Sequence, residues 1–280
     1  MELSPFDSFF ESYSKNVDRA DMLYFWKLSD QIIEKLLHKH IIAMPDSPSC
    51  ILDAGGGTGR WIIKLAQHLP STFILYDRSP AMLAQAEKNI TKANLLDRVT
   101  LREGNLCAMD SIPSESIDAI ISIYNPLSFV DEPRKAVVEL CRILKKGGVI
   151  VVMGQNFYNA LYSKINNFLA SADELINIEN KQCVQWTTGV PPLHMFSKES
   201  LEKLFLDESC DILATYGIPV FAQPTVEDFD SENKQRGRLS QKLENDPLFF
   251  EAVLDIEMKY NSLPNVANRG MNLMMVARKL

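Results

Sequence analysis

The sequence has little of what a metal centre or a disulfide framework requires. Its 5 cysteines lie far apart without a C-x-x-C pair, and none of its 4 histidines stands at ligand spacing from another. His38 and His40 are two positions apart and so lie on different faces of a helix. We therefore expect no metal site, and free thiols that fit a reducing cytoplasm.

Basic charge and long apolar runs are also scarce. The 29 Lys and Arg residues are outnumbered by 36 Asp and Glu, which gives a formal net charge of -7. Nucleic-acid binding normally relies on a basic surface, so this balance argues against a nucleic-acid partner and favours a small-molecule or protein substrate. Neither export nor a membrane span is expected, because no apolar run could cross a bilayer and the segment around Phe6, Phe9 and Phe10 lacks a basic start.

What the sequence does contain is a regular alternation of strand-like and helical segments. Short apolar runs typical of buried strands occur at 50–52, 73–76, 99–101, 117–124, 149–153, 210–218 and 271–277. Apolar residues at helical spacing separate most of them, which predicts an α/β fold with a doubly wound, mostly parallel sheet of seven strands. The segment Lys145 to Gly148 (K-K-G-G) is expected to end a helix before the strand at 149–153.

The chain is expected to have four parts. Residues 1–45 form an N-terminal helical lid, with an amphipathic helix over 18–40, and residues 46–154 form the cofactor-binding core. Residues 155–196, rich in aromatic side chains and Asn, form an insertion over the active site. Residues 197–280 complete the core and hold a mainly helical insertion at about 219–268, which is longer than an ordinary connection needs.

A glycine-rich turn follows the first predicted strand. It runs from Asp53 to Gly59 (D-A-G-G-G-T-G) and by itself predicts only a polar ligand group at a helix N-terminus. A dinucleotide fingerprint G-x-G-x-x-G that began at Gly55 would need glycine at position 60, where the chain has Arg60. The sequence therefore argues against an NAD-linked oxidoreductase, which stays open as an alternative function. No Walker-type sequence is present, which excludes a P-loop ATPase.

This turn and four later segments together resemble the class I S-adenosylmethionine-dependent methyltransferases. In the order and spacing of that family, the later segments are Tyr76-Asp77, Gly104-Asn105-Leu106, Ile117 to Ile121 (I-D-A-I-I) and Leu144 to Gly148 (L-K-K-G-G). The chain is most similar to the ubiquinone/menaquinone C-methyltransferase-like branch, over about residues 48–153. The resemblance implies a Rossmann-like methyltransferase fold and S-adenosylmethionine as the cofactor.

The resemblance also assigns residues to the cofactor. The glycines let the backbone approach its methionine and ribose portions, Asp53 receives the ammonium group, and Asp77 accepts hydrogen bonds from both ribose hydroxyls. Asn105 stands where relatives often have Asp to bind the adenine amino group; Leu106 packs beside the adenine, and Tyr124 contacts the methionine portion. The full expected set is Asp53, Gly55, Gly57, Gly59, Asp77, Arg78, Asn105, Leu106 and Tyr124.

Catalysis by such an enzyme needs few chemical groups. Methyl transfer from a sulfonium is an in-line displacement, in which alignment and water exclusion contribute much of the rate. His194 is the candidate base if the acceptor must lose a proton, and a packed or solvent-facing loop histidine is the alternative. Tyr13 is the candidate to close over the methyl group, as an N-terminal tyrosine does in related enzymes, with ordinary lid packing as the alternative.

Two patterns bear on the acceptor. The segment Tyr124 to Leu127 (Y-N-P-L) partly matches the N-P-P-Y loop of amino-methyltransferases, but without the second proline and the aromatic residue we expect it only to shape the strand end. The aromatic residues of 155–196 predict a small-molecule acceptor with an apolar or aromatic part. The methylated atom (O, N or C) and the oligomeric state stay open, and a non-catalytic protein that uses the cofactor for regulation is a third alternative.

Overall fold

The computed structural model describes residues 5–14, 23–229 and 237–280. Parts of the expected lid, of the helix predicted over 18–40 and of the 219–268 insertion lie outside these residues. Within the described chain, no helix combines the length and the apolar character needed to cross a membrane. The same residues include no group of three or more His, Cys, Asp or Glu side chains that could hold a metal ion.

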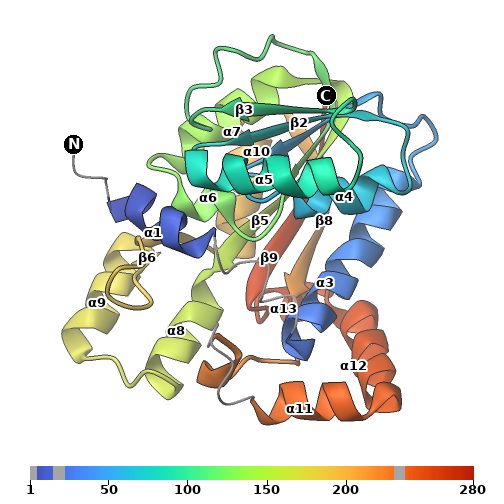
Figure 1. Ribbon diagram of the computed structural model, residues 1–280. Coiled ribbons are helices and arrows are strands. Elements are labelled where there is room, and N and C mark those ends of the chain that lie inside the picture. Colours follow the sequence, from blue (N-terminus) through green and yellow to red (C-terminus); the bar gives the residue numbers. More distant parts are fainter. Residues whose placement is uncertain (1–4, 15–22, 230–236) are drawn as a thin grey trace.

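One sheet of nine strands forms the centre of the molecule. Its main path runs β3-β2-β1-β4-β5-β9-β8, in which β9 is antiparallel to both its neighbours and all other pairs are parallel (Figure 1). The predicted doubly wound, mostly parallel α/β sheet is therefore confirmed, and the seven predicted strands form this path. The described sheet has two more strands than predicted, because β6 (Cys183–Val184) and β7 (Leu193–Phe196) of the insertion join it at the end of β5. The strands of this path are β1 (Cys50–Ala54), β2 (Thr72–Asp77), β3 (Val99–Glu103), β4 (Ile117–Ser122), β5 (Leu144–Asn156), β8 (Cys210–Ile218) and β9 (Asn272–Lys279).

Side chains of successive strand residues alternate between two cores, one on each face of the sheet. In β1, Ile51 packs into the first core and Leu52 into the second; in β5, Val151 and Val152 divide in the same way. Because helices cover both faces, the strands read as continuous apolar runs. The first core is covered by α3 (Tyr24–Leu37), α4 (Arg60–Ala66), α5 (Pro80–Lys92), α11 (Arg238–Asn245) and α12 (Pro247–Tyr260), and the second by α7 (Pro133–Ile143) and α10 (Lys198–Leu206).

The segment predicted as an insertion over the active site holds a third, small core. It consists of α8 (Phe157–Asn166), α9 (Ala172–Lys181), β6 (Cys183–Val184) and β7 (Leu193–Phe196). β7 pairs in parallel with the end of β5, and β6 pairs antiparallel with β7. The helix α1 (Pro5–Tyr13) lies between this unit and α5 (Figure 1), so the N-terminal segment and the insertion meet on one side of the molecule.

Short helices complete the remaining connections. They are η1 (His38–Ile42), a π-helical turn that continues α3, α6 (Pro126–Phe129) after β4, and η2 (Val226–Phe229) and α13 (Pro264–Ala267) in the insertion after β8. In that insertion α11 and α12 meet at Asp246, whose side chain accepts a hydrogen bond from the Phe249 N–H at 3.0 Å and so caps α12.

One predicted boundary is wrong. The sequence indicated a helix that ends at Lys145 to Gly148, but α7 ends at Ile143 and β5 begins at Leu144. Leu144 pairs with Ile117, and the register then shifts so that Val149 pairs with Ala119. Residues 145–148 therefore form an irregularity within the strand, because the strand pairing of Leu144 starts before the glycines.

Candidate active site

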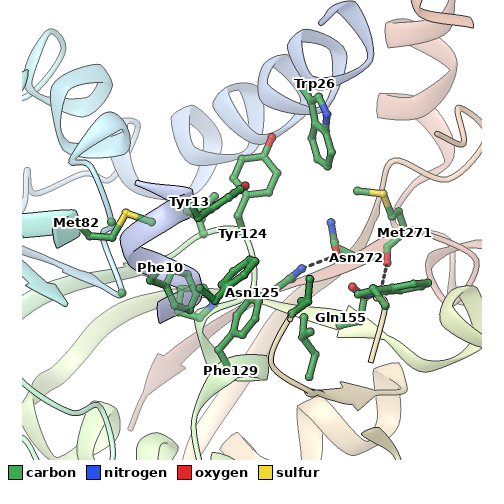
Figure 2. Close-up of a pocket in the computed structure, with 18 of the residues that line it drawn as sticks. Phe10, Tyr13, Trp26, Met82, Tyr124, Asn125, Phe129, Gln155, Met271 and Asn272 are labelled. Atoms are coloured by element: carbon green, nitrogen blue, oxygen red, sulfur yellow. Dashed lines mark hydrogen bonds between the residues drawn. The ribbon is translucent and has the colours of Figure 1, made fainter. Parts of the chain in front are cut away.

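A cavity of about 870 Å³ opens at the carboxyl ends of the parallel strands. β1 lies between β2 and β4, at the point where the strand order reverses, and this is where ligands bind in sheets of this kind. Figure 2 shows side chains that line the cavity, from Met82 near the end of β2 to Met271 ahead of β9. α1, α8 and the chain around Trp186 and Gln223 contribute the remaining walls.

The turn after β1 borders the cavity and has a backbone that favours glycine. Gly55 and Gly57 have φ angles of +74° and +53°, a region that glycine adopts without steric cost. A Cβ atom on Gly55 would lie 2.4 Å from the Cβ atom of Pro126, so a side chain there would collide with the start of α6. At Gly57 a Cβ atom would meet only the Met82 sulfur, at 4.0 Å, so this glycine leaves open room for a ligand.

Asp53 is buried at the end of β1 without a cationic partner in the described chain. Its side chain is 1% exposed, and its Oδ2 atom has no hydrogen-bond partner among the described residues. Burial and the nearby Asp77 carboxylate raise the pKa of Asp53 to about 8. A cationic group stabilises the charged form of such a carboxyl group, so Asp53 fits the ligand ammonium group expected at this position.

Asp77 is held in place by the backbone. The Gly57 N–H donates to its Oδ2 atom at 2.9 Å, and the Ser79 N–H donates to its Oδ1 atom at 2.8 Å. Burial raises the pKa of Asp77, while these two donors oppose the shift because they stabilise the carboxylate. Each oxygen has a second lone pair, so the fixed carboxylate can accept hydrogen bonds from the two hydroxyls of a ribose.

The adjoining wall is formed by Arg78 and by the residues after β3. The guanidinium of Arg78 lies 4.7 Å from the centre of the Phe6 ring in α1. Asn105 and the buried Leu106, which the sequence analysis assigned to the adenine, both line the cavity. Because Asn105 Oδ1 already accepts a hydrogen bond from the Cys107 N–H at 2.9 Å, an adenine amino group would use the second lone pair of that oxygen.

Tyr124 belongs to a cluster that the sequence did not predict. Tyr124 and Asn125 have φ angles of +62° and +69°, in a region that residues other than glycine rarely adopt and that is enriched at functional sites. The Tyr124 hydroxyl donates to Asp30 Oδ1 at 2.5 Å, and Arg60 forms an ion pair with the same carboxylate at 3.1 Å. The available sequence signal was an acid within the apolar face of the predicted amphipathic helix.

Beyond Tyr124 the cavity has aromatic walls. The rings of Phe10 in α1 and Phe129 in α6 meet edge to face, with centroids 5.3 Å apart (Figure 2). On the side of the insertion, the rings of Phe168 and Trp186 lie 5.6 Å apart. These pairs join α1, α6 and the insertion around one space.

Uncharged amides supply most of the polar groups in this part of the cavity. The hydrogen bonds join Asn125 Nδ2 to Asn272 Oδ1 at 2.7 Å, Gln155 Nε2 to the Met271 carbonyl at 3.1 Å (both dashed in Figure 2), and Asn159 Nδ2 to Gln223 Oε1 at 2.8 Å. Among the lining residues that the structure describes, Arg60 and Arg78 are the only Lys or Arg side chains. This part of the described cavity wall is thus mainly aromatic, with neutral amides as most of its polar groups.

The other three predicted residues occupy different positions. Tyr13, 41% exposed, lines the cavity from α1 (Figure 2). Gly59 does not line the cavity; it precedes α4 with a φ of +80°, and a Cβ atom there would lie 3.2 Å from the side chain of Leu75. His194 does not line the cavity either, because it lies in β7 with its Nδ1 atom 3.4 Å from the Cys183 sulfur on the paired strand.

Comparisons with known proteins find similarity to methyltransferases. Residues 51–148 match the model of a family described as a methyltransferase domain. The tRNA 5-carboxymethoxyuridine methyltransferase of Escherichia coli strain K12 is 24% identical over 281 residues, which cover 98% of this chain and 95% of that protein. The demethylmenaquinone methyltransferase of Lactiplantibacillus plantarum is 34% identical over 105 residues, 37% of this chain and 44% of that protein.

A solved structure shows the same fold over nearly the whole chain. The crystal structure of a methyltransferase from Thermotoga maritima superposes with a TM-score of 0.57 at 18% sequence identity, and the match covers 98% of this chain and 99% of that one. The shared fold therefore extends beyond residues 46–154 to the insertion and to the helices after β8.

Proposed function

Since this chain is a class I S-adenosylmethionine-dependent methyltransferase, we propose that it methylates a small molecule with an apolar or aromatic part. The observation that carries the proposal is the space beyond Tyr124, which has paired aromatic rings and uncharged amides as walls. Apolar walls with a few placed polar groups are typical of small-molecule sites.

The residues near the strand ends fit the cofactor. S-adenosylmethionine, when bound, supplies a methyl group on a sulfonium cation. We propose that Asp53 binds its ammonium group, Asp77 its ribose hydroxyls, and Asn105 with Leu106 its adenine. The fit rests on the buried Asp53 carboxyl, whose Oδ2 atom has no hydrogen-bond partner among the described residues, and on the open side of Gly57.

The acceptor walls act through alignment and exclusion of water. Aromatic rings that cover the space keep water away from a reactive centre, and amides can fix the orientation of the acceptor by hydrogen bonds. His194 does not line the cavity, so we propose that transfer proceeds without it as a base. Tyr13, on the exposed side of α1, is the candidate to cover the reacting groups.

A second candidate acceptor is a modified uridine in tRNA. One observation favours it, because the tRNA methyltransferase match spans almost the full length of both chains. The charge opposes it: the net charge is -7, and the described cavity wall carries only two Lys or Arg side chains to meet phosphates. We therefore place the small-molecule acceptor first.

One experiment separates the two acceptors. The enzyme is incubated with methyl-labelled S-adenosylmethionine and a cell extract divided into RNA, protein and small-molecule fractions. We expect label in the small-molecule fraction, in a form that organic solvent extracts, because the proposed acceptor has an apolar part. The Asp77→Asn variant serves as the control for label that does not depend on the cofactor site. Label confined to RNA or protein, or equal labelling by the variant, would overturn the proposal.

A further inference from the structure

A buried acid behind the cavity wall joins three elements. Asp30 in α3 is 6% exposed. Its Oδ1 atom accepts hydrogen bonds from the Tyr124 hydroxyl at 2.5 Å and from Arg60 Nη2 at 3.1 Å, and its Oδ2 atom lies 3.1 Å from Arg60 Nη1. Arg60 begins α4, and Tyr124 follows β4. The carboxylate of one helix thus contacts the start of a second helix and the end of a central strand.

Burial of the Asp30 carboxylate in α3 costs free energy, which suggests that this side chain has a role. Leu28 and Ile32 on the same helix are fully buried, so Asp30 lies within the apolar face of α3. Taking a carboxylate out of water disfavours its charged form, and a buried ion pair often stabilises a fold no better than apolar residues of similar size. Such a pair is more readily explained by what it holds in place.

The two residues that Asp30 contacts, Arg60 and Tyr124, lie at the cavity. Arg60 and Tyr124 both line it, whereas Asp30 does not. The guanidinium of Arg60 lies 5.3 Å from the centre of the Tyr124 ring, and the indole of Trp26, also from α3, meets that ring edge to face at 5.9 Å. Tyr124 has an unfavourable φ of +62°, which persists only where surrounding contacts fix it.

The charge of Arg60 suits one end of the proposed cofactor. The methionine end of S-adenosylmethionine carries a carboxylate, and Arg60 comes directly after the glycine turn, next to the proposed Asp53 subsite. Arg78, the other lining arginine of the described chain, lies on the Asp77 side and pairs with Asp131 at 3.4 Å. Arg60 is therefore the cation suited to the methionine carboxylate.

We propose that Asp30 is a positioning residue, whose carboxylate holds Arg60 and Tyr124 against the methionine end of the bound cofactor. Helix α3 is thereby coupled to cofactor binding without contacting the cofactor. The proposal rests on S-adenosylmethionine as the cofactor and is independent of the acceptor.

The ionisation of Asp30 supplies a readout. Burial raises its pKa to about 6, against the hydrogen bond from Tyr124 and the charge of Lys64, while Glu34 on the same helix adds to the rise. Arg60 also faces it from α4. At pH 7.5 Asp30 is mainly ionised and holds Arg60 as an ion pair. Near pH 5 it is mainly protonated, and the pair loses one of its charges.

Calorimetry with S-adenosylhomocysteine tests the proposal on the full chain. At pH 7.5 we expect Asp30→Asn to weaken binding roughly tenfold, the effect of losing a hydrogen bond to a charged group. Tyr124→Phe should also weaken binding. The double variant should bind S-adenosylhomocysteine as tightly as Asp30→Asn within about twofold, because both changes break one contact.

Glu34→Gln is the matched control, since this half-exposed acid lies on the same helix and pairs with Lys64. The affinity of this variant for S-adenosylhomocysteine should match that of the parent protein.

The pH dependence separates positioning from a merely structural role. We expect the affinity ratio of the parent to Asp30→Asn to fall toward one near pH 5, where the parent carboxyl is also neutral. A ratio that stays constant from pH 5 to 7.5, or additive effects in the double variant, would overturn the proposal. If Asp30→Asn does not fold, the affinity ratio of the parent to Tyr124→Phe decides, because titration of Asp53 and Asp77 cancels in this ratio. A ratio above one at pH 7.5 that falls toward one near pH 5 supports the proposal, and a ratio that does not change with pH contradicts it. A parent protein that binds no S-adenosylhomocysteine at any pH would overturn the cofactor assignment itself.

Discussion

At the scale of single residues, Asp77 is the proposed ribose ligand that the backbone holds most firmly. Two backbone N–H groups fix its carboxylate, and two ribose hydroxyls are its proposed ligands. We expect Asp77→Asn to weaken S-adenosylhomocysteine binding by roughly 10- to 100-fold, because hydrogen bonds to a charged group are replaced by weaker ones. Calorimetry measures this, with the exposed Asp110→Asn as the control. Equal affinity of the Asp77 variant and the parent would place the ribose elsewhere.

Asp53 makes stability depend on pH in a direction that can be worked out. Its pKa in the folded, cofactor-free protein is about 8, above the value of 3.8 for an ordinary Asp. Between these values the folded state holds a proton that the unfolded chain has lost, so this group's stabilising contribution falls as pH rises. The change is up to about 1.4 kcal/mol per pH unit.

Urea unfolding of the parent and of Asp53→Asn at several pH values between 5 and 8 checks this sign. The difference in the free energy of unfolding, parent minus variant, should decrease with rising pH, because contributions from other titrating groups largely cancel in the difference. A difference that is constant or increases with pH would show that Asp53 is not protonated in the folded protein.

The residues that could be predicted are those whose chemical type and position at a strand end both indicate a ligand site. The glycine turn, Asp77 and Asn105 follow strand ends, and parallel strands bring their carboxyl ends to one edge, so their proximity followed from the alternating pattern. Asp30 and Arg60 lie far apart in the sequence, and their pairing depends on how α3 packs on α4. No spacing rule predicts such a contact, so the cluster of Asp30, Arg60 and Tyr124 could not be predicted from the sequence.

At the scale of elements, α1 contributes an apolar part of the cavity wall, on the proposed acceptor side. Phe10 packs on Phe129 and lines the cavity, while Glu11 on the same helix is exposed. We expect Phe10→Ala to lower methyl transfer to the labelled small-molecule fraction by roughly tenfold, because it removes apolar contact with the acceptor and admits water. Binding of S-adenosylhomocysteine should change by less than about twofold, since the cofactor residues lie elsewhere.

Glu11→Ala is the matched control for this change. It alters the same helix without removing a cavity wall, so transfer and cofactor binding should both stay near the parent values. If Phe10→Ala transfers methyl groups as fast as the parent, or if cofactor binding alone accounts for its loss of activity, α1 is not part of the acceptor wall.

The helices and strands differ in how clearly the sequence pattern predicts them. The strands of the main sheet could be predicted because both their faces are buried, which gives continuous apolar runs. The helix boundary at Lys145 to Gly148 was wrong because the pairing of Leu144 with Ile117 overrides the local glycine signal. The short pairing of β6 with β7 had no sequence signal, since it depends on the insertion folding back onto the end of β5.

At the scale of the whole molecule, the charge of -7 bears on the class of acceptor. A protein that contacts 6–10 phosphates of a nucleic acid loses about 10³- to 10⁵-fold in affinity between 50 and 200 mM salt. Binding of a neutral small molecule involves no such release of counterions, so we expect the KM for the acceptor fraction to change by less than about twofold over this range. A steep rise of KM with salt would favour the tRNA acceptor instead.

We propose that one cavity holds S-adenosylmethionine over the strand ends and presents it to the space walled by α1 and the insertion. A crystal structure with S-adenosylhomocysteine bound tests this arrangement. We expect the ammonium group at Asp53, the ribose at Asp77, and the sulfur directed toward the space beyond Tyr124. A ligand bound away from the glycine turn, or bound there with its sulfur directed away from that space, would contradict it.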